Sequence, residues 1–241
     1  MQVVILCGGK GTRAYPYTEF MPKPMLPVAG QPILLHVMRI FASQGYDQFI
    51  LSLGYRKETI IDYFHHKALE WDVQFVDTGD ETDTGGRIQA LEDRLGDQFM
   101  ATYVDGLADI RLDKLVDFHN SHSGPATVTG VPLVSQYGTI EMNESGRIKA
   151  FREKPVLREH WINAGFFMFD KSVFDHWEGT NLEKHVMPGL VEEGLIYTYR
   201  HDGFFKSMDT YKDQQEIEQL HQEGNSPWQI SQTTSPRGEA G

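Results

Sequence analysis

Short apolar runs alternate with amphipathic segments along the first half of the chain. The runs at 3–7, 49–53, 73–76, 99–104 and 126–132 predict strands, and the segments at 33–43, 58–66, 87–95 and 112–122 predict helices. Strands that are apolar throughout are buried on both faces, and strand–helix alternation favours parallel pairing. We therefore expect an α/β fold with a mostly parallel, Rossmann-like twisted sheet and helices on both faces.

The pattern changes in the second half. The stretch "GTIEMNESGRIKAF" predicts a β-hairpin that turns at "NESG", and 162–170 predicts a further strand. A helix is expected over 182–193, strands within 195–209, and a helix over 210–220. From position 229 the chain is polar and has few apolar anchors. We expect one domain over residues 1–228, with an additional hairpin subregion, and a flexible tail over 229–241.

Composition narrows the class of protein. The 241 residues suit one large domain, and no run of eighteen apolar residues is present, so no membrane partner is expected. The chain opens directly on a strand-like run, which is not typical of a secretory signal. The single cysteine, Cys7, fits a reducing compartment, and we expect a cytoplasmic protein in which Cys7 is a core residue. The net charge of −12 argues against nucleic-acid binding.

The first strand leads into a glycine-rich loop, "CGGKGTRAYPYTEFMPKPMLP". Its glycines formally match the dinucleotide fingerprint, but that fingerprint requires a helix directly after the loop. Four prolines between positions 16 and 27 exclude a long helix there, and the P-loop pattern is absent. A dinucleotide-dependent oxidoreductase is therefore disfavoured.

The same loop has the composition of a phosphate cradle. Without Cβ atoms, glycine backbone N–H groups can approach phosphate oxygens closely. Within residues 8–27, Lys10, Arg13 and Lys23 face only Glu19, a local excess of two positive charges. From these residues alone, a cradle and an ordinary turn with surface cations are equally compatible with the sequence.

At the level of motifs, "GGKGTRAYPYTEFMPKP" resembles the signature of the sugar-1-phosphate nucleotidyltransferases. The segments "VDTGDETDTGGR", "YVDGLAD", "FREKP", "NAGFF" and "SMDT" follow in the order found in the glucose-1-phosphate cytidylyltransferase branch. The resemblance covers about residues 1–228. It implies a magnesium-dependent enzyme that joins CTP and a sugar 1-phosphate, or a related small phosphate or phosphonate, and releases pyrophosphate.

The resemblance also implies roles for individual residues. Such transfer depends on positioning and charge neutralisation, and Arg13 and Lys23 would be the catalytic cations on the triphosphate. The implied nucleotide-binding residues are Leu6, Gly8, Gly9, Lys10, Gly11, Thr12, Arg13, Lys23, Thr82 and Arg87.

Two aspartates are the expected metal ligands. Asp105 follows an apolar strand, and Mg²⁺ is usually held by one or two carboxylates and phosphates. Without the resemblance, Asp105 would be a turn residue and Asp209 the N-cap of the last helix. The resemblance favours Mg²⁺ ligation for both.

The acceptor site is expected around the second-half motifs. By resemblance, Lys154 would bind the phosphate of the acceptor, Glu153 a hydroxyl group, and Asn163 another part of the sugar. His119 and His122 are expected to be surface histidines rather than a metal site, and the segment "HWEGTNLEKH" to be core and cover.

The sequence also departs from the resemblance. Cytidylyltransferase relatives have a longer basic segment where this chain has only residues 65–72, and there it contributes to oligomer contacts. Whether this chain forms a homo-oligomer, and which phosphate it accepts, therefore stay open. Two alternatives also remain: the same reaction with UTP or dTTP, and a non-catalytic nucleotide-binding regulatory subunit. Retention of Arg13, Lys23, Asp105 and Asp209 together counts against the latter.

Overall fold

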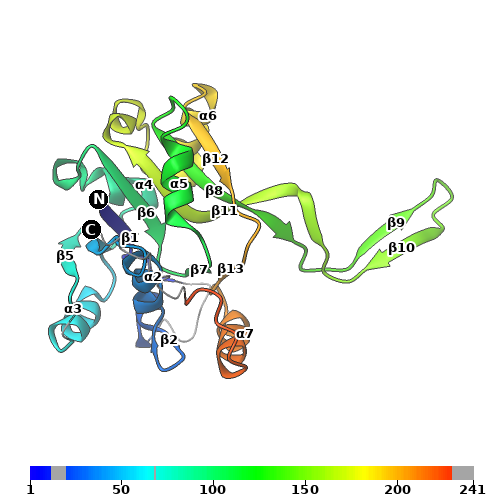
Figure 1. The fold of residues 1–241 in the computed structure, drawn as a ribbon, viewed down its shortest axis with the longest axis horizontal. Coiled ribbons are helices and arrows are strands. Elements are labelled where there is room, and N and C mark those ends of the chain that lie inside the picture. Colours follow the sequence, from blue (N-terminus) through cyan, green and yellow to red (C-terminus); the bar gives the residue numbers. More distant parts are fainter. Residues whose placement is uncertain (12–19, 68, 230–241) are drawn as a thin grey trace, which may run out of the picture.

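The centre of the molecule is a seven-stranded mixed sheet (Figure 1). The computed structural model describes residues 1–11, 20–67 and 69–229. The strands run in the order β12-β8-β11-β6-β1-β4-β5, and only β11 is antiparallel to its neighbours. The expected α/β fold with a mostly parallel sheet is confirmed. The strands are β1 (Gln2–Leu6), β4 (Gln48–Leu53), β5 (Asp72–Asp77), β6 (Gln98–Tyr103), β8 (Ala126–Val134), β11 (Val156–Asp170) and β12 (Ile196–Arg200).

Helices cover both faces of this sheet. Along β1, Val3 and Ile5 enter one core cluster while Val4 and Leu6 enter the other, which explains why the run is continuously apolar. The first cluster is completed by α2 (Ile33–Ala42), α3 (Lys57–His65), α5 (Leu112–His119) and α7 (Tyr211–Gln222). The second is completed by α4 (Thr84–Gln89), η4 (Lys171–His176), η5 (Leu182–Val186) and α6 (Met187–Glu192).

Three element boundaries differ from the sequence-based expectation. The helix expected over 87–95 is instead α4, which starts at Thr84, followed by the short helix η3 (Glu92–Arg94). Gly86 donates its backbone N–H to the Thr180 carbonyl at 2.8 Å, and a Cβ at Gly85 would lie 3.0 Å from that carbonyl oxygen. The close approach of these two segments therefore favours glycine in this helix. The helix expected over 112–122 ends at His119, and β11 begins six residues before position 162.

The expectation of surface histidines is wrong for His119. This side chain is buried, with Nδ1 2.8 Å from the Thr127 hydroxyl and Nε2 3.2 Å from Asp170 Oδ1. Both ring nitrogens therefore have protein partners, as a buried imidazole requires.

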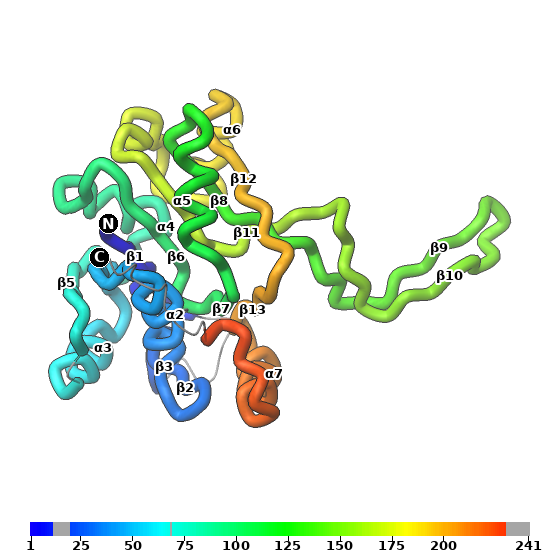
Figure 2. The backbone as a smooth tube through the Cα atoms, viewed as in Figure 1, coloured from blue at the N-terminus to red at the C-terminus, as the bar shows by residue number. Residues whose placement is uncertain are grey.

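Short elements extend from this framework. The hairpin of β9 (Thr139–Met142) and β10 (Ile148–Arg152) forms an arm that projects from the body (Figure 2). It is the hairpin subregion that the sequence predicts, with its turn at 143–146. The other short elements are η2 (Lys23–Met25), β2 (Pro27–Val28), β3 (Gln31–Pro32), β7 (Gly106–Ala108) and β13 (Phe205–Ser207). Within the described ranges, no helix has both the length and the apolar character needed to cross a bilayer.

Candidate active site

A cleft of about 650 Å³ opens where the parallel strands β1 and β6 end. Ligands in open α/β folds bind at such carboxyl ends, and this volume suits a small-molecule ligand. The structure brings ten of the predicted site residues into its lining: Leu6, Gly8, Gly9, Gly11, Lys23, Thr82, Arg87, Asp105, Asn163 and Asp209.

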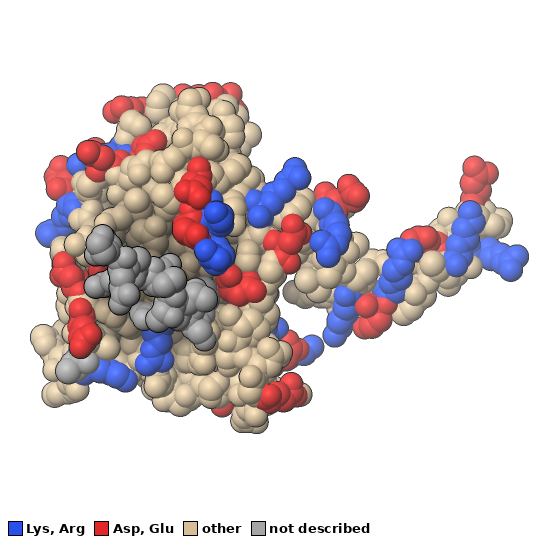
Figure 3. Space-filling view, in the orientation of Figure 1, with Lys and Arg blue, Asp and Glu red and all other residues tan. Residues whose placement is uncertain are grey.

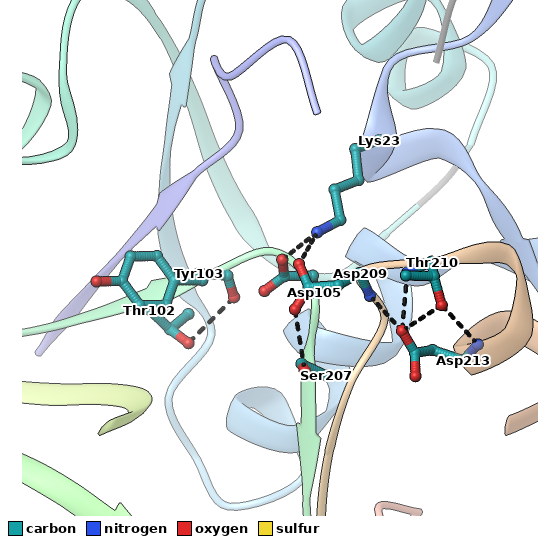
Figure 4. Close-up of polar contacts among 8 residues, drawn as sticks. All are labelled: Lys23, Thr102, Tyr103, Asp105, Ser207, Asp209, Thr210 and Asp213. Carbon is teal, nitrogen blue, oxygen red and sulfur yellow. Dashed lines mark hydrogen bonds and ion pairs between the residues drawn. The ribbon is translucent and has the colours of Figure 1, made fainter. Parts of the chain in front are cut away.

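The side chain of Lys23 lies between the two predicted metal ligands (Figure 4). Its ammonium donates to Asp105 Oδ2 at short range and to Asp209 Oδ1 at 3.0 Å. Lys23 is 7% exposed, so its charge is withdrawn from water and matched by two carboxylates. Asp209 also accepts a 3.2 Å hydrogen bond from the Ser207 hydroxyl.

Tertiary contacts exclude the helix-capping role that was considered for Asp209. The N-cap of α7 is Thr210, whose hydroxyl accepts from the Asp213 backbone N–H at 3.2 Å, while Asp213 accepts from the Thr210 N–H at 2.8 Å. This reciprocal capping box satisfies the helix N-terminus. The N-cap role is therefore wrong for Asp209, whose carboxylate instead faces Lys23.

Arg87 is placed behind the glycine loop. Its guanidinium donates to the backbone oxygens of Leu53 (3.0 Å), Gly8 (3.1 Å) and Asp80 (3.3 Å), and to the Thr78 hydroxyl (2.7 Å). A Cβ at Gly8 would lie 1.9 Å from Arg87 Nη1, so only glycine fits there. These contacts make Arg87 a brace for the loop that also borders the cleft.

The loop 77–83 carries one predicted nucleotide contact, Thr82, and is joined to the glycine loop by an ion pair. Lys10 is half exposed and forms an ion pair with Glu81, outside the cleft lining. Thr82 donates its hydroxyl to the Thr78 carbonyl at 2.5 Å. Lys10 thus ties the two loops together at the surface.

A polar cluster that the sequence did not reveal occupies another part of the cleft lining. The Tyr103 hydroxyl donates to Glu183 Oε1, and the Thr84 hydroxyl donates to Glu183 Oε2 at 2.8 Å. Burial, followed by the bond to Glu183, raises the pKa of Tyr103 above its ordinary value. Glu183 falls in the segment expected to be core and cover. An isolated glutamate in a helical pattern carries no local signal of a site.

Five predicted residues are absent from this lining, and Lys10, described above, is one of them. Thr12 and Arg13 lie outside the described residues. Glu153 and Lys154 are exposed at the junction of β10 and β11, and they are absent from the lining. Of the three expected acceptor residues, Asn163 therefore lies in the cleft, whereas Glu153 and Lys154 are separated from it within one copy of the chain.

The residues present fit a magnesium ion. Mg²⁺ prefers oxygen ligands and typically takes one or two carboxylates together with substrate phosphates. Asp105 and Asp209 both contact one cationic atom, Lys23 Nζ, so their oxygens converge on a single position. No group of three or more potential His, Cys, Asp or Glu ligands occurs in the described part of the chain. The arrangement thus suits a metal completed by phosphate oxygens.

Cys7 also borders the cleft, yet it has the properties of a core residue. It is 1% exposed, and burial raises the pKa of its thiol well above its ordinary value. A protonated, buried thiol is a poor nucleophile, which confirms the expectation of a packing role.

Comparisons with known proteins agree with this geometry. Residues 2–195 match the family model described as "Nucleotidyl transferase". A probable glucose-1-phosphate cytidylyltransferase of Bacillus subtilis is 38% identical over 255 residues, covering 95% of this chain and 100% of that protein. The glucose-1-phosphate cytidylyltransferase of Salmonella typhi is 35% identical, covering 95% and 98%.

Solved structures share the fold. The crystal structure of HddC from Yersinia pseudotuberculosis superposes with a TM-score of 0.72 at 23% identity, covering 91% of this chain and 99% of that one. A second crystal of HddC, complexed with GMP-PN, gives a TM-score of 0.71. With the family match, the full-length similarity and a cleft built at the ends of β1 and β6, this chain belongs to the nucleotidyl transferase family.

Proposed function

We propose that this protein is a magnesium-dependent cytidylyltransferase that acts on a sugar 1-phosphate. A phosphate oxygen of the acceptor attacks the α-phosphorus of CTP, the bond from that phosphorus to the bridging oxygen breaks, and pyrophosphate leaves with the bonding electrons. The product is a CDP-linked sugar. Support comes mainly from the position of Lys23, held between Asp105 and Asp209 beside the glycine loop.

In this proposal the chain supplies position and charge. Backbone groups of Leu6, Gly8, Gly9 and Gly11 hold the nucleotide, and Arg87 keeps their loop in place. A bound Mg²⁺ ion, held by Asp105 and Asp209, would neutralise charge on the phosphates. The acceptor is already an anion near neutral pH, so the reaction requires no general base.

In this proposal the Lys23 ammonium occupies two positions in turn, first at the carboxylate pair and then at the triphosphate. An ammonium and a divalent cation would compete for the same pair of carboxylates and repel each other, so Lys23 would leave the pair when the metal is held. Its flexible side chain then reaches the triphosphate, where it stabilises the negative charge that develops on the leaving pyrophosphate. Arg13 is assigned to the same phosphates.

The sugar is assigned to the side of the cleft formed by Asn163, Tyr103 and Glu183. Asn163 Oδ1 accepts the Gly165 backbone N–H at 2.7 Å, which fixes the orientation of its amide. The Glu183 carboxylate is a hydrogen-bond acceptor that suits sugar hydroxyl groups. These groups favour a polyhydroxylated acceptor over a simple phosphate.

A pyrophosphate-release screen tests this function. It crosses ATP, CTP, GTP, UTP and dTTP with sugar 1-phosphates and with other small phosphates and phosphonates. We expect the fastest turnover with CTP and a hexose 1-phosphate. Faster turnover with UTP or dTTP would refute the choice of base and leave the reaction class intact. Binding of a nucleotide without turnover of any pair would indicate a regulatory subunit.

A further inference from the structure

The two carboxylates that face Lys23, Asp105 and Asp209, flank one short antiparallel ladder of β7 and β13 (Figure 1). At one end of this ladder, Met208 donates its backbone N–H to the Asp105 carbonyl at 2.9 Å. At the other end, Asp109 donates its backbone N–H to the Phe204 carbonyl at 3.2 Å. The spacing of the two carboxylates therefore depends on how β7 and β13 pair, and a two-stranded ladder alone is only marginally stable.

A histidine and an aspartate close the end of the ladder that lies away from the carboxylate pair. His201 directly follows β12, and its backbone N–H donates to the Gly130 carbonyl on β8 at 2.9 Å, which fixes it to the central sheet. Its Nε2 lies 2.9 Å from Asp109 Oδ1 and 3.2 Å from the Phe204 carbonyl oxygen. Because a carbonyl oxygen only accepts hydrogen bonds, Nε2 carries a proton. The ring thus contacts both strands at the last pair of the ladder.

This contact is withdrawn from water. Figure 3 shows acidic and basic side chains spread over the surface of the body, where solvent and salt screen them. His201 is instead 8% exposed, and Asp109 Oδ1 is a buried atom that accepts no well-aligned hydrogen bond from the described residues. Removing the His201 ring would leave this buried carboxylate oxygen without the proton that faces it, which is costly.

A glycine makes room for the contact. A Cβ at Gly203 would lie 2.3 Å from Asp109 Oδ1 and 2.6 Å from His201 Cε1, closer than van der Waals contact allows. An alanine at position 203 would therefore push His201 and Asp109 apart, although neither side chain would be altered.

The other end of the ladder carries the carboxylate pair. Lys23 contacts both Asp105 and Asp209 there (Figure 4). The Ser207 hydroxyl, on β13, donates to Asp209 Oδ2 at 3.2 Å, while Oδ1 faces Lys23. Asp105 and Asp109 are four positions apart, or about 13 Å along a strand, so both ends belong to one short element.

We propose that His201 is a positioning residue for the carboxylate pair. It holds the Asp109 side chain and the Phe204 backbone together, which fixes the pairing of β7 with β13 and so the spacing at which Asp105 and Asp209 share one cation. The identity of that cation as Mg²⁺ rests on the proposed function, whereas the role of His201 in the ladder does not.

Hydrogen exchange tests the ladder without metal or substrate. His201→Leu removes the Nε2 donor and keeps a side chain of moderate size, whereas Gly203→Ala keeps both partners and separates them. Each change should raise the exchange rate of the Met208 amide, at the opposite end of the ladder, by about tenfold or more. His201→Gln, whose amide nitrogen can replace Nε2 as the donor, should restore the wild-type rate.

His119→Leu is the matched control. His119 is also buried and contacts an aspartate, Asp170, at 3.2 Å, but it packs between α5, β8 and β11. In urea it should lose about as much stability as His201→Leu. Only His201→Leu should raise Met208 exchange by more than the loss of global stability explains. A Met208 rate unchanged by both His201→Leu and Gly203→Ala would overturn the proposal.

Binding of Mn²⁺ tests the spacing of the carboxylates. Each change is combined with Lys23→Met, which removes the competing ammonium, and the bare protein is titrated with Mn²⁺ under electron paramagnetic resonance. His201→Leu and Gly203→Ala should weaken binding by about ten- to a hundredfold, whereas His201→Gln and His119→Leu should leave it unchanged. Equal affinity in all four proteins would show that the carboxylates keep their spacing without His201, and would overturn its positioning role.

Failure of the proposed function would be a different result. A wild type without turnover of any substrate pair would refute that function, and the exchange and Mn²⁺ measurements would still decide whether His201 positions the pair.

Discussion

The ammonium of Lys23 lies 3.0 Å from Asp209 Oδ1, although the two residues are 186 positions apart in the chain. Asp105 completes the contact from the end of β6. The three residues come from η2, from the turn after β6 and from the turn before α7, so the fold assembles a cation site from three separate segments. Lys23 occupies that site and satisfies both carboxylates.

The first prediction follows from this occupancy. Replacing Lys23 by Met removes the competing cation, so a divalent ion should bind the bare protein at least about tenfold more tightly, a change of about 1.4 kcal/mol. Titration of the protein with Mn²⁺, followed by electron paramagnetic resonance without nucleotide, measures this affinity. Lys57→Met, which removes the lysine of the exposed Lys57–Asp77 pair, is the matched control and should leave the affinity unchanged.

That experiment has a clear contrary outcome. Equal Mn²⁺ affinity in the wild type and in Lys23→Met would show that the ammonium and the ion do not share the carboxylate pair.

The second prediction concerns the aspartates. Asp105→Asn and Asp209→Asn each keep size and remove charge, so each should lower turnover by about a hundredfold or more while the protein stays folded. The double variant should be little worse than either single variant, because both residues would act through one ion. Pyrophosphate release at saturating Mg²⁺ is the measurement.

Thr210→Ala separates this role from helix capping. Loss of the N-cap hydroxyl should cost about 1 kcal/mol of unfolding free energy and leave turnover unchanged, whereas Asp209→Asn should lower turnover. Near-wild-type turnover of Asp209→Asn would remove Asp209 from the proposed metal site.

The third prediction concerns the brace behind the glycine loop. Arg87→Met keeps the length of the side chain but leaves the carbonyls of Gly8 and Leu53 without this donor. Unfolding free energy from urea denaturation should fall by about 2–3 kcal/mol. The exposed Arg111, changed to Met, is the control and should alter stability little. An unchanged midpoint for Arg87→Met would show that water replaces the guanidinium at these carbonyls.

The fourth prediction concerns the C-terminal segment. Trp228 is 1% exposed, and its ring packs against Phe204 with centroids 5.8 Å apart. A chain that ends at Trp228 should keep its melting temperature and its turnover, because the removed residues 229–241 have few apolar side chains that could anchor them. A chain that ends at residue 227 should lose about 3–5 kcal/mol of stability. Melting of both truncated chains by calorimetry distinguishes them, and a large loss on removing 229–241 alone would show that the tail docks.

The fifth prediction is a pH dependence that originates at His36. The Trp228 indole N–H donates to His36 Nδ1 at 3.4 Å, so Nε2 carries the ring proton and donates to the Val28 carbonyl at 2.8 Å. Burial is the main cause that lowers the pKa of His36 in the folded protein. The unfolded chain, with a His pKa of about 6.5, therefore binds the proton more readily, and stability falls as the pH falls below about 6.5.

Urea denaturation between pH 7.5 and pH 5.5 measures this effect. His36→Gln offers an acceptor and a donor but does not titrate, so its stability should depend less on pH over this range. Identical pH dependence in both proteins would assign the effect to other histidines.

Several features were determined by the sequence alone because they depend on local pattern. Continuous apolar runs specify strands buried on both faces, and prolines after the glycine loop exclude the helix that a dinucleotide site needs. The hairpin turn at 143–146 likewise follows from residues adjacent in the chain. The apolar run before Asp105 likewise places this residue after a strand, at an edge where parallel sheets carry ligands, whereas its role as a metal ligand was implied only by the resemblance.

Other features were decided only by the tertiary structure, because they depend on which segments meet. The tertiary fold brings Asp209 to Lys23, and Thr210 is the N-cap of α7. The "SMDT" motif alone does not predict which of these two residues caps the helix. Glu183 enters the cleft because η5 packs against α4, which starts at Thr84. Sequence identifies Lys154 as a basic residue before a proline. Lys154 is separated from the cleft only by the direction in which the arm leaves the body. Packing, and not local periodicity, places side chains that are far apart in the sequence.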